Sequence, residues 1–427
     1  MARLLIRGGR VVDPSQGIDR IDDVLVQDGV VASIGGKAAA AAEETIDATG
    51  LIVCPGLVDM HVHLREPGRE EDETIATGAR AAVAGGFTSI ACIPNTEPPI
   101  DTQANVEFIH QKAARADACN VFVVACVSRN REGKELADLG QLVEAGAVAF
   151  SDDGAPVSDA ELMRRAFEYC RMFDKPILAH EEVLELSRGG VMNEGLVSLV
   201  LGLPGMPAAA EDVMIGRDIA LAEVTGGRLH VMHVSTAGGV AMIRAAKARG
   251  ARVTAEACPH HFTLTDESLR GFDSNFKMSP PLRTAADVDA IIAGLMDGTI
   301  DCIATDHAPH AIEKKMLELD RAPFGILGLE TAVGLAVTRL VVPGRIGWPR
   351  LIEAMSTLPA RILGIDRGTL RSGAIADITL IDPDHAWRVD VERFYSKSVN
   401  SPFDGWMLQG RAVATIVGGR VKHRLGP

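Results

Sequence analysis

The chain has 427 residues, of which 47% are hydrophobic and 23% charged, a balance typical of globular proteins that excludes a disordered chain. With 43 basic and 57 acidic residues it carries a formal charge of −14, which argues against a nucleic-acid-binding protein. Only 4% of its residues are aromatic, which favours an aliphatic core around buried parallel strands. We find no signal-peptide pattern and no run of about 18 apolar residues, so we expect a cytoplasmic location.

Both ends of the chain show short runs of alternating apolar and polar residues, broken by Gly and Asp, a pattern typical of strands and turns. The N-terminal runs are LLIRGGRVVD, DVLVQDGVVASIG and ETIDATGLIVCPG, and GAIADITLIDPD and AVATIVGGRVK lie near the C-terminus. We predict that residues 1–55 and 365–427 form one composite β-sandwich domain. The alanine run at 38–42 is expected to be a loop.

Between these ends, residues 56–364 alternate short apolar runs with windows of helical periodicity, such as 72–86, 159–173 and 237–250. Eight candidate strands occur, at 57–61, 88–92, 121–125, 147–151, 176–180, 229–233, 252–256 and 301–305. Eight strand-then-helix units over about 300 residues have the size and order of a (β/α)8 TIM-type barrel. The predicted fold class is therefore α/β, with residues 258–299 as an insertion before the last strand.

Histidine and aspartate residues gather at the ends of the predicted barrel strands. They are His61, His63, Asp152, Asp153, His180, His233, Asp306 and His307. The carboxyl ends of barrel strands meet at one mouth, where active sites are built. His61 and His63 are two residues apart, so both side chains point the same way on an extended strand. So many imidazoles and carboxylates at one mouth predict a metal site, and the imidazoles favour zinc.

Two nearby residues are expected to lie outside the ligand set. Asp59 shares a strand face with His61 and is expected to orient a ligand imidazole. His230 is three residues from His233, so strand alternation predicts that it faces the opposite side of the strand.

Several motifs carry a resemblance to a known family. The segment PGLVDMHVHLREPG (55–68) resembles the metal-site opening of the amidohydrolase superfamily, in its cyclic-amidase branch. Together with this opening, IPNTEPPID, FSDDGAPV, CPHHF, FKMSPPLR, ATDHAPH and APFGILGLET resemble the dihydroorotase family, in its long bacterial (class I) type. The resemblance covers essentially the whole chain, and the conjunction of these motifs is more specific than the opening alone.

This resemblance implies a site of two zinc ions, bridged by a carboxylate and a hydroxide. His61, His63 and Asp306 would hold one ion, and His180 and His233 the other. Many superfamily members bridge the ions with a carboxylated lysine, but no lysine occurs between Lys134 and Lys175. Asp153 matches the aspartate that replaces this lysine in the long bacterial type. The spacing leaves Asp152 open as an alternative bridge.

The resemblance also implies substrate contacts and a catalytic group. Asp306 would be the catalytic proton carrier, and the substrate-binding residues would be His63, Arg65, Asn95, Ser279, His310, Phe324 and Gly325. Arg65 suits a substrate carboxylate because a guanidinium meets it with two parallel hydrogen bonds. Ser279 departs from the family, which most often has Asn there, so a direct contact is in doubt at this position.

The implied activity is the reversible, zinc-dependent cyclisation of N-carbamoyl-L-aspartate to L-dihydroorotate in pyrimidine biosynthesis. The substrate would be a small anion, with no nucleic acid and no membrane as partner. A homodimer and an association with aspartate carbamoyltransferase are further expectations from the family. Two alternatives stay open: another cyclic amidase, such as a hydantoinase or allantoinase, and a non-catalytic structural partner of that transferase.

Overall fold

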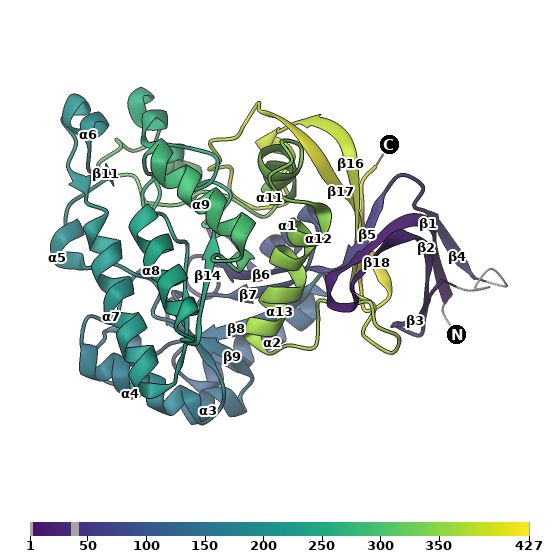
Figure 1. Ribbon diagram of the computed structural model, residues 1–427, viewed down its shortest axis with the longest axis horizontal. Coiled ribbons are helices and arrows are strands. Elements are labelled where there is room, and N and C mark those ends of the chain that lie inside the picture. The colour runs from purple at the N-terminus through teal and green to yellow at the C-terminus, as the bar shows by residue number, and fades with distance from the viewer. Residues whose placement is uncertain (1–2, 36–41, 427) are drawn as a thin grey trace.

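A computed structural model describes residues 3–35 and 42–426, and it shows a barrel beside a β-sheet unit (Figure 1). Most of the alanine run expected to be a loop therefore lies outside the described residues. The barrel, its helices and the composite β unit confirm the predicted α/β fold class. The domain boundaries at 55/56 and 364/365 stay a prediction. Among the described residues, no helix combines the length and the apolar character needed to cross a bilayer.

The barrel consists of eight parallel strands that follow one another in chain order. They are β6 (Leu57–Val62), β7 (Phe87–Cys92), β8 (Asn120–Ala125), β9 (Ala147–Phe150), β10 (Pro176–Ala179), β13 (Arg228–Val231), β14 (Val253–Ala257) and β15 (Cys302–Ile303). Each of the eight predicted strands corresponds to one of these. The last strand meets the first beyond its end, where the backbone N–H of His63 donates to the carbonyl of His307 at 2.9 Å. The barrel therefore closes at the level of the predicted site.

A helix follows each barrel strand and packs on the outside of the barrel (Figure 1). These helices are α1 (Ile75–Gly85), α2 (Gln103–Ala116), α3 (Leu139–Glu144), α4 (Ala160–Arg171), α7 (Ala209–Thr225), α8 (Ala237–Ala248), α9 (Ala285–Asp297) and α11 (Ala332–Ala336). The α4 helix illustrates why: Asp159 caps its first turn, and Met163, Ala166, Phe167 and Cys170 form one buried stripe. The predicted insertion at 258–299 contains the 3-10 turns η3 (Asp266–Gly271) and η4 (Ser274–Phe276), followed by α9.

Further short elements lie between these strands and helices. The short elements α5 (Leu184–Ser187), β11 (Met192–Asn193), α6 (Leu196–Leu201) and β12 (Gly205–Met206) lie between β10 and α7, and α10 (Ile312–Lys315) follows β15. The segments η5 (Val337–Val341), α12 (Trp348–Ile352), η6 (Glu353–Thr357) and α13 (Leu358–Leu363) complete the barrel region. Ile362 and Leu363 of α13 pack with Val58, Met60 and Leu178 of the strands into one buried apolar cluster.

Strands from both terminal regions form a single mixed sheet beside the barrel (Figure 1). Its members are β1 (Arg3–Asp13), β2 (Ile18–Gln27), β3 (Val30–Ile34), β4 (Glu44–Asp47), β5 (Ile52–Pro55), β16 (Ile378–Arg388), β17 (Met407–Val417) and β18 (Arg420–Arg424). The two halves join where β5 pairs with β16. The sheet is fastened to α1 through Thr379 and Thr415, whose hydroxyls each donate to a carbonyl at 2.6 Å, of Gly86 and Val83 respectively.

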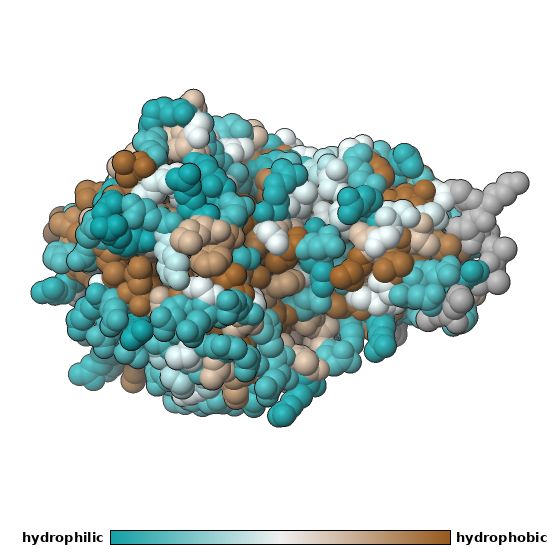
Figure 2. All heavy atoms as spheres, turned by 90° about the horizontal axis from the view of Figure 1, so that it is seen from below, coloured by the Kyte–Doolittle hydropathy of each residue, from teal (hydrophilic) through white to brown (hydrophobic). Residues whose placement is uncertain are grey.

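Figure 2 shows that hydrophilic and hydrophobic side chains are interspersed over one face of the molecule. Exposed apolar side chains occurring among charged ones are usual for a globular protein surface.

Candidate metal centre and substrate pocket

The six predicted metal ligands lie together, buried at the carboxyl ends of the barrel strands. Their potential ligand atoms form overlapping groups within 4.8 Å: His61, His233 and Asp306; His61, His63 and Asp153; and Asp153, His180 and His233. Four imidazoles and two carboxylates converging in this way are a donor set suited to divalent metal ions. This buried cluster is consistent with the metal site predicted at the barrel mouth, while the role of each residue and the identity and number of the ions stay predictions.

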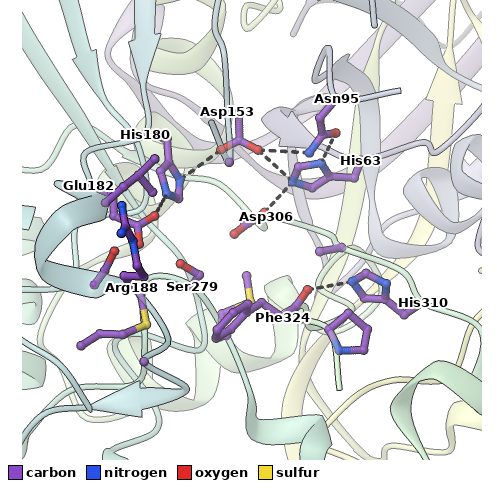
Figure 3. A pocket seen from close by; sticks show the side chains of 18 of the residues that line it. His63, Asn95, Asp153, His180, Glu182, Arg188, Ser279, Asp306, His310 and Phe324 are labelled. Carbon is purple, nitrogen blue, oxygen red and sulfur yellow. Dashed lines mark hydrogen bonds and ion pairs between the residues drawn. The ribbon is translucent and has the colours of Figure 1, made fainter. Parts of the chain in front are cut away.

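Asp153 lies between the two halves of this cluster. Its Oδ1 is 3.3 Å from Nδ1 of His180, and its Oδ2 is 3.5 Å from Nε2 of His63. Figure 3 shows the carboxylate between these two imidazoles. Asp152 instead turns to the backbone, where its Oδ1 accepts from the N–H groups of Val127 and Ser128 at 2.9 and 3.2 Å. Of the two aspartates, Asp153 is the one positioned to contact both sides.

Each of three imidazoles has an outer acceptor that leaves one nitrogen lone pair for the centre. Nδ1 of His61 donates to Oε1 of Glu256 at 2.6 Å, and Nε2 of His180 donates to Oε2 of Glu182 at 2.9 Å. Nδ1 of His63 donates to Oδ1 of Asn95 at 2.8 Å. Such outer acceptors fix the tautomer and ring orientation of metal-binding histidines. Nε2 of His61 is buried with no hydrogen-bond partner, as expected of a nitrogen intended for an ion.

Three predicted site residues have a left-handed backbone conformation, although none is glycine. The φ angles are 59° at Arg65, 31° at His233 and 48° at Asp306. Such conformations are strained for L-residues and persist where the surrounding structure holds them, often at functional sites. At His233 this turn comes just after β13 ends at Val231, and it directs the imidazole into the cluster.

Charges in the site favour ionised carboxylates. Burial alone would raise the pKa of Asp153, but hydrogen bonds from His180 and His233 lower it well below its usual range. Burial likewise opposes the charge on Asp306, and the nearby His61 and His63 lower its pKa in the same way. Burial lowers the pKa of Arg65 to about 10, so its guanidinium stays charged at neutral pH.

A cavity of about 630 Å³ opens beside the cluster, and most of the predicted substrate residues line it. The lining includes His63, Arg65, Asn95, Ser279, His310 and Phe324. In Figure 3 the cluster lies on one side of this cavity, and Ser279, Phe324 and His310 lie on the other. Gly325 is not among the lining residues but directly follows Phe324.

Three of these lining residues make hydrogen bonds to other groups of the protein. Nε2 of His310 donates to the carbonyl of Phe324 at 2.7 Å, and its Nδ1 accepts from Nη2 of Arg69 at 3.2 Å. Nδ2 of Asn95 lies 3.5 Å from Oδ2 of Asp153. Arg65 donates through Nε to the carbonyl of Pro309 at 3.2 Å and also lines the cavity.

Sequence reasoning missed Glu256 and mistook the positions of two neighbours. Asp59 does not orient an imidazole: its Oδ1 accepts from the backbone N–H groups of His61 and Thr305, each at 3.1 Å. His230 does not face away from the site, because its Nε2 donates to Oε2 of Glu256 at 3.1 Å. A signal for Glu256 was present, since it is the last residue of a predicted strand.

Comparison of the sequence with known proteins identifies the family to which the chain is similar. Residues 50–238 match the family model described as "Dihydro-orotase-like". The dihydroorotase of Citrifermentans bemidjiense is 54% identical over 422 residues, covering 99% of both chains. The dihydroorotase of Pelotomaculum thermopropionicum is 56% identical over 419 residues, covering 98% of both chains.

Among solved structures, the L-hydantoinase (dihydropyrimidinase) from Arthrobacter aurescens matches with a TM-score of 0.90 and 28% identity, covering 100% of this chain and 97% of that one. A D-hydantoinase (dihydropyrimidinase) from Thermus sp. matches with a TM-score of 0.85 and 27% identity, covering 99% and 97%. The barrel and sheet are therefore common to cyclic amidases, whereas the much higher sequence identity separates one family within that fold. On this evidence the chain belongs to the dihydroorotase family of enzymes.

Proposed function

We propose that this enzyme catalyses the reversible cyclisation of N-carbamoyl-L-aspartate to L-dihydroorotate, a step of pyrimidine biosynthesis, with two zinc ions. The observation that carries the proposal is the buried cluster of four histidines and two aspartates beside a cavity lined by the charged Arg65. The cluster suits hydrolysis or formation of an amide, and the guanidinium suits a substrate with a carboxylate.

The ligand set fits zinc on two grounds. Nε2 of His61 is buried without a hydrogen-bond partner, and outer acceptors hold His61, His63 and His180 with the other ring nitrogen facing the cluster. His61, His63 and Asp306 would hold one ion, His180 and His233 the other, and Asp153 would bridge them. Bound zinc would polarise the ring amide carbonyl and supply a nucleophile for it at neutral pH.

Asp306 is the proposed proton carrier. In the hydrolytic direction it takes up the proton released as the ring carbonyl is attacked and delivers it to the leaving ring nitrogen. Its Oδ1 lies 2.9 Å from Nε2 of His63 and 3.3 Å from Nε2 of His61, so it is held in the cluster and lines the cavity. In the biosynthetic direction it removes a proton from the carbamoyl nitrogen as that nitrogen attacks the side-chain carboxyl carbon, and it delivers the proton to the carboxylate oxygen that leaves as hydroxide.

Residues on both sides of the cavity are proposed to bind the substrate carboxylate and ring. Arg65 would make the principal ion pair, because it is buried, charged and on the cavity wall. His63, Asn95, Ser279 and His310 would add polar contacts, and Phe324 and Gly325 would contact the ring. Because both ring nitrogens of His310 are already engaged, its contact requires an exchange of one of these hydrogen bonds.

Parallel assays test the proposal against another cyclic amidase. Purified protein is assayed on dihydroorotate, hydantoin and allantoin, each with and without a chelator. We expect turnover of dihydroorotate alone, lost with the chelator and restored by zinc. A preference for an uncarboxylated ring, or activity that survives complete metal removal, would overturn the proposal. Absence of any turnover with a fully metal-loaded protein would favour the non-catalytic alternative.

We further propose, from the family resemblance, that the enzyme forms a homodimer and associates with aspartate carbamoyltransferase. Light scattering on the purified protein, with and without that transferase, tests both assemblies. A monomer whose mass is unchanged by the transferase would refute them.

A further inference from the structure

The connection between β16 and β17 is much longer than the strands require. Arg388 at the end of β16 pairs with Met407 at the start of β17, so a tight turn would join them. Residues 389–406 instead leave the sheet and reach the barrel mouth, with η7 (Val391–Arg393) as their one helical element. Long irregular connections inside a compact protein are often functional.

The first part of this connection holds the loop that carries Arg65. The hydroxyl of Ser396 donates to Oε2 of Glu73 at 2.5 Å, and the backbone N–H of Lys397 donates to Oε1 of Glu73 at 3.2 Å. The hydroxyl of Ser398 donates to the carbonyl of Asp72 at 2.6 Å. The loop after β6 is therefore fastened to a segment that is distant in the sequence.

The second part inserts one amide between two segments of the pocket wall. Oδ1 of Asn400 accepts from the backbone N–H of His310 at 3.0 Å, and its Nδ2 donates to the carbonyls of Ala308 and Gly325 at 3.0 and 3.1 Å. The backbone carbonyl of Asn400 also accepts from the N–H of Leu327 at 3.0 Å. With 2% of its surface exposed, the side chain is surrounded by the groups it binds.

These two segments carry proposed substrate residues. Ala308 and His310 line the cavity from one segment, and Phe324 lines it from the other. The segments approach so closely that a Cβ added at Gly325 would lie 2.6 Å from the carbonyl oxygen of Ala308. A small rotation of either segment would therefore move His310 and Phe324 relative to each other and to Arg65.

We propose that Asn400 is a positioning residue for substrate binding, which sets the spacing of the His310 and Phe324–Gly325 segments from outside the cavity. The proposal rests on the proposed function, because it assigns the affected step to binding of the carboxylated ring. Asn400 is not among the described residues that line the cavity, so it acts through these two segments. Only an amide offers one acceptor and two donor hydrogens in this arrangement, and an aspartate would set a carboxylate oxygen against two carbonyl oxygens.

The test compares Asn400→Asp with Gln409→Glu. Gln409 lies on β17, away from the cavity, and donates through Nε2 to the carbonyl of Pro383 at 3.2 Å. Both changes replace an amide donor to a carbonyl by a carboxylate. We expect Asn400→Asp to raise KM for dihydroorotate about tenfold or more with kcat within about twofold, and Gln409→Glu to change neither. Metal content should equal that of the wild type in both variants.

Hydrogen exchange supplies a readout that does not depend on the substrate. In Asn400→Asp, amides of residues 308–326 should exchange faster, while those of β6 and β14 stay protected. Unchanged exchange of these amides, or an unchanged KM in a folded variant, would overturn the positioning role. A fall in kcat that matches a fall in bound metal would overturn it as well. If Asn400→Asp does not fold, Asn400→Ala is read by the same criteria. A wild-type enzyme inactive on dihydroorotate would refute the proposed function, while the exchange data would still show whether Asn400 holds the 308–310 and 324–325 segments in place.

Discussion

Nδ1 of the buried His61 lies 2.6 Å from Oε1 of the equally buried Glu256, at the floor of the metal centre. Burial opposes the charge on Glu256, but the nearby His61 and hydrogen bonds from His230 and His61 lower its pKa to about 2. Glu256 is therefore an ionised acceptor that holds the His61 imidazole with its Nε2 toward the cluster.

Replacing Glu256 by Gln should weaken metal binding by about tenfold to a hundredfold, because a neutral amide holds the imidazole less firmly and makes it a weaker ligand. Equilibrium dialysis against a buffered zinc series measures this affinity. Glu211→Gln is a matched control: Glu211 is buried in α7, and its Oε1 accepts from the backbone N–H of Ser235 at 2.8 Å. Equal zinc affinities in wild type and Glu256→Gln would contradict the assigned role.

Mutation of the two adjacent aspartates after β9 should have different effects, on metal binding for Asp153 and on thermal stability for Asp152. Asp153→Asn should lose bound metal and nearly all turnover, because its carboxylate lies between His63 and His180. Asp152→Asn should keep its metal but unfold at a lower temperature, since it weakens an acceptor for two backbone N–H groups, worth about 1–3 kcal/mol. Metal analysis and thermal unfolding of both variants provide the measurement. Full metal content in Asp153→Asn would instead favour Asp152 as the bridge.

Asp306→Asn should preserve much of the fold and lower kcat by about a hundredfold to ten-thousandfold, because the amide cannot accept and return the proton. Single-turnover rates on dihydroorotate, normalised to bound zinc, measure the effect apart from any loss of metal. A rate per bound metal close to that of the wild type would exclude Asp306 as the proton carrier.

Arg65→Met should mainly raise KM for dihydroorotate, by tenfold or more, because it removes the charged partner proposed for the substrate carboxylate. Steady-state kinetics on dihydroorotate give the split between KM and kcat. For a ring without a carboxylate, such as dihydrouracil, the same variant should show no comparable loss of binding. An unaltered KM for dihydroorotate would place the carboxylate elsewhere.

Glu330 should make stability depend on pH. Its Oε1 accepts from the backbone N–H groups of Tyr395 and Ser396 at 2.8 and 3.1 Å, but burial and the charge of Glu73 raise its pKa to about 8. Because the folded pKa lies above the ordinary 4.5, its contribution to stability is complete below about pH 4.5 and is lost as pH rises to about 8. Glu330→Gln keeps an oxygen that accepts these hydrogen bonds but has no carboxyl proton to lose. The Tm of this variant, relative to that of the wild type, should therefore rise by a few degrees between pH 5 and pH 8. A Tm difference that is constant over this range would show that Glu330 is ionised throughout.

Local pattern was sufficient to predict the barrel and the gathering of histidine and aspartate residues at its mouth, whereas the substrate residues were implied only by the family resemblance. Strand periodicity located all eight barrel strands, and because parallel strands present their carboxyl ends at one mouth, the convergence of His61, His180 and Asp306 followed from their positions alone. The terminal strands were also predictable as a composite unit from their alternation.

Other features depended on contacts that no local pattern encodes. The alternation rule failed for His230 because it compared a residue inside β13 with one beyond it. His230 lies within β13, which ends at Val231, whereas the φ angle of 31° at His233 turns the chain after the strand, so strand register does not determine where the His233 side chain points. The choice between Asp152 and Asp153 required the backbone N–H groups of residues 127 and 128. The contacts of Asn400 could not be predicted from local pattern because its partners lie far away in the sequence.

The pairing of β5 with β16 also bears on synthesis of the chain. On the ribosome, β1 to β5 emerge before the barrel, yet the edge of β5 finds its neighbour β16 only after the whole barrel has been made. The segment that braces the pocket, around Asn400, emerges later still. A nascent chain of this enzyme therefore carries an open sheet edge, a feature prone to aggregation, throughout synthesis of the barrel, and it acquires a complete active site only after the Asn400 segment has emerged.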